Sequence, residues 1–261
     1  MLRNPDMDGE RFAELVEVMR RLLGPGGCPW DRAQTPESMR RFVIEEAFEL
    51  VEAIDAGDPS ALREELGDLL MQVVFLGELA ADRDWFTTAD AIAGIRDKLV
   101  RRHPHVFGDA TAKDAAEVLA RWEAIKREEK QGRGLLDGIP VTMPALSRAV
   151  AVGEKAARVG YDWTDAAGVR QKIDEELAEL DGAPDPDEEE KELGDLLFAI
   201  ASWARKRGHD PEAALRRALD RFGGRMRRVE AKATADGVAL ESLDADALDD
   251  RWRAAKAEER E

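Results

Sequence analysis

A hexapeptide that occurs twice constrains the fold of this chain more than any other sequence feature. Residues 65–70 and 192–197 both read Glu-Leu-Gly-Asp-Leu-Leu. The acids before each copy recur at a similar interval, since Glu46 and Glu176 are 130 positions apart (176 − 46). The repeat therefore predicts a tandem duplication of one unit of about 110–130 residues, a common domain size.

Helical periodicity dominates both halves. Apolar residues recur three or four positions apart in almost every long segment, and no stretch shows the alternation of a half-buried strand. We therefore predict an all-α fold with an N-terminal helical domain (1–130), a Gly- and Pro-containing linker (131–145) and a C-terminal helical domain (146–261).

Local signals refine these helices. Pro36 behind Thr35 predicts one helix start, and Thr88 predicts the cap of another. Gly67 and Gly194 lie inside predicted helices, where glycine costs about 1 kcal/mol relative to alanine, so they predict close packing against another helix.

Composition excludes several classes of protein. A net charge of −17 argues against a nucleic-acid binder and against an anionic membrane surface, although local cations and a bound metal leave room for a small polyphosphate. Cys28 is the one cysteine, so no disulfide forms within the chain. The start lacks the apolar region of a signal peptide, and the apolar runs are shorter than a membrane span. These features predict a soluble, cytoplasmic protein.

Each half carries two pairs of carboxylates at helical spacing. Residues three apart lie on one face of a helix, so each pair points in one direction. The acids are Glu46, Glu49, Glu65 and Asp68 in the first half, and Glu176, Glu179, Glu192 and Asp195 in the second. If the two helices of a half pack antiparallel, the four carboxylates meet, and Mg²⁺ relieves their repulsion. A solvated acidic face is the alternative, and the recurrence of the same acids in both halves favours the metal site.

Basic residues and one tryptophan per half are candidate substrate contacts. They are Lys98, Arg101, Arg102 and Trp122 in the first half, and Lys172, Arg221, Arg225 and Trp252 in the second. Cations four apart suit a polyphosphate, and a tryptophan can stack on a base. The alternatives are a solvated basic surface, a salt bridge from Lys172 to Glu176, and a core position for each tryptophan.

These motifs together resemble the MazG family of nucleoside triphosphate pyrophosphohydrolases, over almost the whole chain. The resemblance rests on Gly27-Cys28-Pro29-Trp30-Asp31, both acidic motifs, the segment 101–107 (Arg-Arg-His-Pro-His-Val-Phe), Arg121-Trp122-Glu123, and the segment 159–163 (Val-Gly-Tyr-Asp-Trp). It implies tandem four- or five-helix MazG-like bundles, a homodimer, and hydrolysis of nucleoside triphosphates to monophosphate and pyrophosphate in nucleotide-pool housekeeping. The implied cofactor is Mg²⁺ or Mn²⁺, with one or two ions per site.

The resemblance also assigns roles to residues of the second half, where it places the main activity. It implies Glu176, Glu179, Glu192 and Asp195 as metal ligands, and Lys172, Arg221, Arg225 and Trp252 as nucleotide contacts. The first half keeps all four of its acids, so no missing ligand marks it as inactive.

A mechanism and three alternatives follow. Glu175, beside Glu176 and Glu179, is the candidate acceptor of the proton of an attacking water. A di-iron bundle would need Glu-x-x-His pairs, which the acidic motifs do not contain. A non-catalytic module that binds nucleotide and metal, and a dimerisation role for the first half, stay open.

Overall fold

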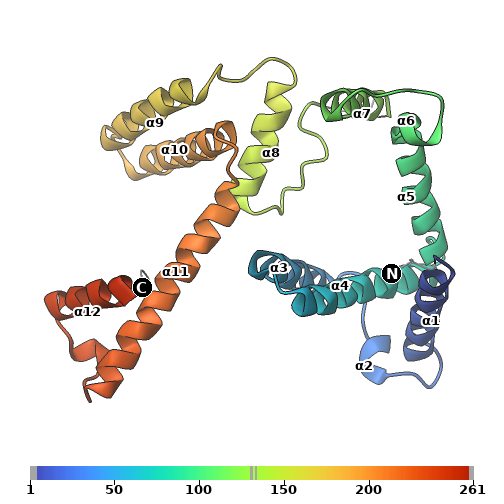
Figure 1. Cartoon of the computed structure of the whole chain (residues 1–261), viewed down its shortest axis with the longest axis horizontal. Coiled ribbons are helices and arrows are strands. Elements are labelled where there is room, and N and C mark those ends of the chain that lie inside the picture. The colour runs from blue at the N-terminus through green and yellow to red at the C-terminus, as the bar shows by residue number, and fades with distance from the viewer. Residues whose placement is uncertain (1–4, 130–131, 133, 259–261) are drawn as a thin grey trace. The chain divides into compact units, whose positions relative to one another are not determined.

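All regular elements of the described part of the chain are helices, which confirms the predicted all-α class (Figure 1). The computed structural model describes residues 5–129, 132 and 134–258. The chain divides into two compact units, residues 1–131 and 132–261. Of the predicted linker, residues 131 and 133 lie outside the described residues, and 134–144 form turns and irregular backbone.

The first unit runs from α1 to α7. Its helices are α1 (Pro5–Leu23), α2 (Pro29–Arg32), α3 (Arg40–Ala56), α4 (Pro59–Ala81), α5 (Thr88–Arg102), α6 (Pro104–Phe107) and α7 (Ala115–Glu129). Helix α4 packs against α1, α3 and α5, and α7 packs against α5. The core between α1 and α4 is built from Val16, Met19, Met39, Val74, Phe75 and Leu79.

The second unit repeats the pair of acidic helices. Its helices are α8 (Ala145–Ala157), α9 (Ala166–Asp181), α10 (Pro186–Lys206), α11 (Pro211–Ala235), a short 3-10 helix η1 (Leu240–Ser242) and α12 (Ala245–Glu258). The α9–α10 pair corresponds to α3–α4 and shares a small core of Ile173, Leu196 and Ala199. Helix α8 was not anticipated from the sequence.

One predicted helix start is wrong by just over one turn and another by one residue. Helix α3 begins at Arg40 rather than near Thr35, because Thr35 and Ser38 exchange hydrogen bonds between backbone N–H and hydroxyl groups (2.9 and 3.2 Å) and hold a separate turn. Thr87, not Thr88, caps α5, and it forms a capping box with Asp90. The α5 error arises because two adjacent threonines can supply the same capping hydroxyl, whereas α3 begins after Met39, which makes no side-chain cap.

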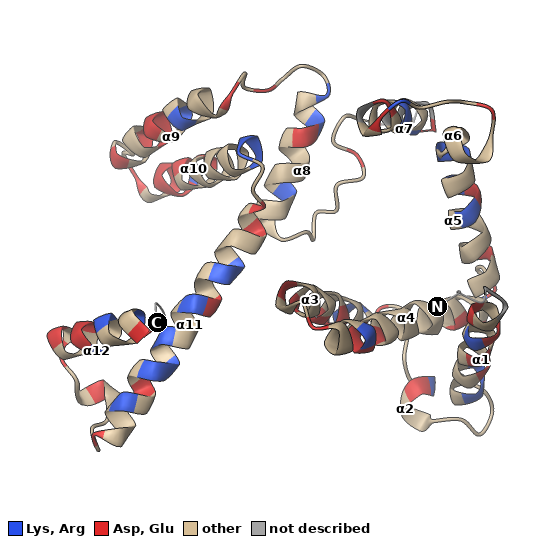
Figure 2. Ribbon diagram, in the orientation of Figure 1, with Lys and Arg blue, Asp and Glu red and all other residues tan. Residues whose placement is uncertain are grey.

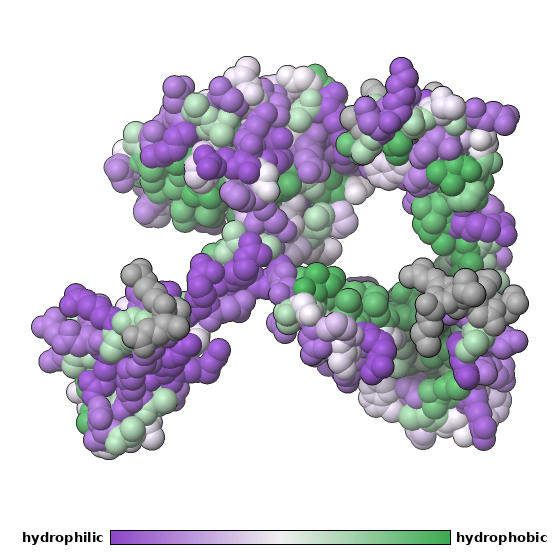
Figure 3. All heavy atoms as spheres, viewed as in Figure 1, coloured by the Kyte–Doolittle hydropathy of each residue, from purple (hydrophilic) through white to green (hydrophobic). Residues whose placement is uncertain are grey.

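The prediction that Gly67 and Gly194 pack closely against another helix is wrong within this chain. A Cβ built on either glycine meets no heavy atom within 4 Å. Each glycine lies beside exposed leucines, Leu66 and Leu70 on α4 or Leu193 and Leu197 on α10. Figure 3 shows hydrophobic surface over both helix pairs and over α5. The small residue is therefore set in an apolar face that no described element of its own unit covers.

Among the described residues, no helix combines the length and apolar character that crossing a membrane requires.

Candidate active site

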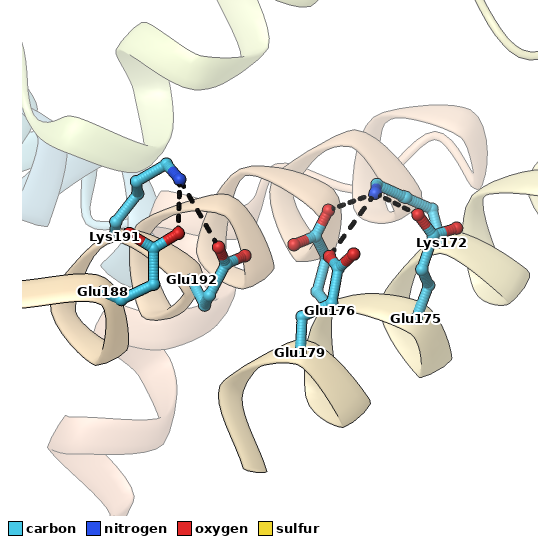
Figure 4. Close-up of polar contacts among 7 residues, drawn as sticks. All are labelled: Lys172, Glu175, Glu176, Glu179, Glu188, Lys191 and Glu192. Carbon is cyan, nitrogen blue, oxygen red and sulfur yellow. Dashed lines mark hydrogen bonds and ion pairs between the residues drawn. The ribbon is translucent and has the colours of Figure 1, made fainter. Parts of the chain in front are cut away.

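Acidic residues lie along both α9 and α10 of the second unit (Figure 2), and the side chains of Glu176, Glu179 and Glu192 approach one another between these helices (Figure 4). Asp165 caps α9 and Asp185 caps α10 through backbone N–H groups, so both helices have defined starts. Carboxylate oxygens of Glu176, Glu179 and Glu192 all lie within 4.8 Å of one another. Three of the four predicted acids of this unit therefore meet.

Burial makes this cluster electrostatically strained. Glu176 is only 4% exposed, and its Oε2 has no hydrogen-bond partner. Burial also raises the pKa of Glu192, and the nearby Glu179 carboxylate raises it further, against the opposing effect of Lys191. An unpartnered buried carboxylate oxygen costs free energy that a ligand can recover. The cluster is thus built to receive a positively charged group.

Lys172 provides part of that positive charge from the same helix. Its Nζ lies 2.6 Å from Glu175 Oε1, 2.7 Å from Glu176 Oε1 and 3.9 Å from Glu179 Oε2 (Figure 4). The hydrogen bonds to Glu175 and Glu176 raise the pKa of Lys172. The structure therefore contains the i,i+4 salt bridge between Lys172 and Glu176 that was the alternative interpretation of Lys172. The same ammonium group also binds Glu175, the candidate proton acceptor.

A cavity of about 700 Å³ opens beside these residues. The acidic and basic residues along it are Asp162, Lys172, Glu175, Glu176 and Asp195. Its other walls are the segment 160–163 and the side chains of Phe198 and Ala199. This combination of an apolar wall with a few convergent charged groups is typical of a small-molecule site. Asp195, the fourth predicted acid, faces the cavity although it is outside the cluster of three.

Asp162 anchors the cavity wall to the end of α10. Its Oδ1 accepts a hydrogen bond from Arg205 Nη2 (2.6 Å), and its Oδ2 accepts one from Arg205 Nη1 (3.3 Å) and lies 2.6 Å from Lys206 Nζ. Lys206 also donates to the backbone carbonyl of Trp163. The Arg205 hydrogen bonds, with those of Lys206, lower the pKa of Asp162 to about 2. The clamp therefore holds the backbone of Trp163, one of the residues that line the cavity, against the end of α10.

We expect Asp162→Asn to lower the free energy of unfolding at neutral pH by about 1–2 kcal/mol, because the clamp loses its charge. The pKa of Asp162 is about 2 in the folded protein and about 3.9 in the unfolded chain. The carboxylate therefore stabilises the fold fully at pH values above about 3.9, and this stabilisation is lost as the pH falls towards about 2. The difference between wild type and variant should therefore shrink from pH 4 to pH 2 in urea titrations. Asp174→Asn, which removes an exposed ion pair with Arg170, is the control and should show no such convergence. A constant difference over that range would contradict the clamp.

The first unit forms a matching cluster between α3 and α4. Carboxylate oxygens of Glu46, Glu49 and Glu65 lie within 4.8 Å of one another. Burial raises the pKa of both Glu46 and Glu65, and Asp68 and Glu49 raise both further. Gln72, a residue the sequence analysis overlooked, donates from Nε2 to Glu46 Oε1 at 3.2 Å.

The predicted arginine and tryptophan contacts form separate groups in both units. Arg102 lies over the Trp122 ring (5.3 Å to its centroid), and Arg225 lies over the Trp252 ring (5.5 Å). The cavity lining includes none of Arg221, Arg225 and Trp252. Figure 1 shows why, since α12 folds against the part of α11 farthest from α8. Within one chain, these side chains therefore stand apart from the acids.

The basic residues of α5 are engaged in the first unit. Arg101 and Arg102 both pair with Glu129 of α7, and the Arg102 hydrogen bond is the main cause of a lowered Glu129 pKa, to about 2. Arg102 is buried, whereas Lys98 is exposed. Arg101 and Arg102 therefore tie α5 to α7 in this structure.

The residues present fit a hard divalent cation in both units. Each cluster offers three carboxylates from two helices, which suits an ion that prefers oxygen ligands and keeps some of its waters. The unpartnered Glu176 oxygen gives the second unit a further reason to accept one. The acidic motifs supply no histidine or cysteine that would favour a softer metal.

Comparison with known proteins agrees with this chemistry. Residues 34–107 match the MazG nucleotide pyrophosphohydrolase domain. The chain is 46% identical over 250 residues to a nucleoside triphosphate pyrophosphohydrolase/pyrophosphatase of Thermotoga maritima, covering 95% of this chain and 96% of the relative. It is 42% identical over 254 residues to the nucleoside triphosphate pyrophosphohydrolase of Escherichia coli K12, covering 94% and 97%.

Proposed function

Since this chain belongs to the MazG family of nucleotide pyrophosphohydrolases, we propose that its second unit hydrolyses nucleoside triphosphates to monophosphate and pyrophosphate in a Mg²⁺-dependent reaction. The observation that carries the proposal is the cluster of Glu176, Glu179 and Glu192 with a buried, unpartnered oxygen beside the cavity. Glu176, Glu179, Glu192 and Asp195 would hold Mg²⁺. When bound, the ion would acidify a water and neutralise the phosphates.

The chain's own residues would supply orientation and proton transfer. Lys172 lies where it can exchange its carboxylate partners for a phosphate oxygen, because it is held on the cavity side of the cluster. Glu175 also lines the cavity and would accept the proton of the water that attacks the α-phosphorus. Tyr161 and Trp163 also line the cavity, and their rings would pack against the bound substrate.

We further propose that the protein acts as a homodimer. Large apolar side chains of both helix pairs are 40% exposed or more, namely Ile44, Phe48, Ile54, Leu66, Leu70 and Val73 in the first unit and Leu177, Leu193, Leu197 and Ile200 in the second. Contiguous exposed apolar faces of this kind mark association surfaces. Gly67 and Gly194 would let a second helix approach these faces closely. A partner could also bring Arg221, Arg225 and Trp252 to a site that one chain leaves without them.

The metal requirement gives a direct test. We expect pyrophosphate release from at least one member of a panel of NTPs and dNTPs in Mg²⁺, complete loss after chelation, and recovery on adding Mg²⁺ or Mn²⁺. The physical reason is that the clustered carboxylates cannot bind a triphosphate without an intervening cation. Activity that survives exhaustive chelation would contradict the metal assignment, and orthophosphate as the product would contradict attack at the α-phosphorus. A housekeeping role predicts higher kcat/KM for noncanonical nucleotides than for the common ones.

A further inference from the structure

The two units carry the same acids but give the first acid of the cluster different partners, and this acid is half-buried in the first unit (Glu46) and buried in the second (Glu176). In the first unit, Glu46 receives a hydrogen bond from the neutral amide of Gln72 at 3.2 Å. In the second unit, the equivalent Glu176 receives the charged Nζ of Lys172 at 2.7 Å. Lys172 corresponds in sequence to Phe42 (172 − 42 = 130), and Gln72 corresponds to Ala199 (199 − 72 = 127). A neutral amide thus partners Glu46 and a charged ammonium group partners Glu176.

The charge difference bears directly on metal binding. A neutral amide adds no net charge beside the first cluster, and Phe42 is occupied with the core and with the Trp30 ring, 5.7 Å away between centroids. The ammonium of Lys172 lies among the oxygens of the second cluster, 2.7 Å from Glu176 and 3.9 Å from Glu179. A divalent cation entering there would meet a like charge and would compete for the same oxygens.

We propose that Lys172 is a tethered counter-cation that competes with the metal for the α9 carboxylates. The second unit then takes up its metal efficiently only with an anionic ligand, whereas the first unit binds metal without nucleotide. The second half of this inference rests on the proposed function, because it takes a triphosphate as the anion.

The position of Lys172 allows the exchange. Its side chain is 34% exposed and lines the cavity, so a phosphate entering the cavity reaches the ammonium without repacking the core. An anion there gives Lys172 a new partner and frees the oxygens of Glu176 and Glu179. Metal and triphosphate would therefore strengthen each other's binding, as linkage requires of any two coupled ligands.

The test is a titration with Mn²⁺ alone, followed by electron paramagnetic resonance of the free ion, on the full chain. Glu49→Gln silences the first cluster, so that the signal reports the second. In that background we expect Lys172→Met to tighten Mn²⁺ binding about tenfold, because one positive charge leaves the cluster. Lys172→Arg keeps the charge and should leave the affinity close to that of the background. Arg170→Met removes a charge from the same helix where it pairs with Asp174, outside the cluster, and should have a much smaller effect.

A second titration tests the coupling. A saturating non-hydrolysable α,β-methylene triphosphate should increase the Mn²⁺ affinity of the Glu49→Gln protein. The same analogue should increase the Mn²⁺ affinity of the Glu49→Gln/Lys172→Met protein by a smaller factor. Far-UV circular dichroism melts check that each variant is folded, and Mn²⁺ should raise the melting temperature of the Lys172→Met form more than that of its parent.

Unchanged or weaker Mn²⁺ binding in folded Lys172→Met would overturn the inference, as would equal coupling to the analogue in both forms. Pyrophosphate release by wild type is measured separately. If it is absent while Lys172→Met still tightens Mn²⁺ binding, the proposed hydrolysis fails and the competition between Lys172 and metal stands. If it is present while Mn²⁺ binding is unaffected, only the inference fails.

Discussion

Glu179→Gln is expected to reduce pyrophosphate release by about 10³-fold or more while leaving the protein folded. The Glu179 side chain is 50% exposed, so an amide of the same shape costs little in packing. The substitution nevertheless removes a charge and an anionic oxygen from a cluster whose members lie within 4.8 Å. Initial rates at saturating Mg²⁺ and substrate, with a melting curve for each variant, measure the effect.

Two further variants make this result specific. Glu190→Gln changes an exposed acid on α10 outside the cluster and should retain activity close to that of wild type. Glu49→Gln makes the equivalent change in the first unit, and we expect the smaller loss there. If Glu49→Gln abolishes the reaction and Glu179→Gln does not, the active site belongs to the first unit.

Much of the acidic site was predictable because helix geometry fixes it. Once residues 65–70 and 192–197 are placed on helices, a spacing of three puts Glu192 and Asp195 on one face. The pairing of this helix with the preceding one then follows from the short connection between them. Asp58 caps the start of α4 after that connection, and Asp185 caps the start of α10. The duplication also favours a shared site, since an acidic face kept only for solubility has no reason to recur in the same order.

The parts that sequence did not reveal depend on distances between elements. The Asp162 clamp joins residues 43 positions apart, and the Gln72–Glu46 hydrogen bond joins residues 26 apart, so no local spacing signals either contact. Arg225 and Trp252 likewise lie apart from the acids because of their helices. Arg225 is on α11, and Trp252 is on α12, which packs against α11. For Gln72 a signal did exist, because its exchange for Ala199 accompanies the exchange of Phe42 for Lys172.

The double variant Leu70→Asp/Leu197→Asp is expected to convert a dimer into monomers. The leucines are 40% and 47% exposed, and each is followed or preceded at helical spacing by other exposed apolar residues. Burying a leucine at an interface contributes about 1.5–3 kcal/mol, and a buried aspartate would cost more than that gain. We therefore expect the dimer dissociation constant to rise at least 100-fold, as measured by sedimentation equilibrium.

Gln171→Asp is the matched control for this variant. It adds one negative charge to α9 at an exposed polar position, so it should leave the dimer intact. A wild-type protein that sediments as a monomer would contradict the proposed dimer outright. Pyrophosphate release should fall with dissociation, because α4 and α10 carry acids on one side and the exposed leucines on the other. Loss of the apolar partner would free the two helices of each acidic pair to move relative to each other. The proposed metal site depends on three carboxylates from those helices staying within 4.8 Å of one another.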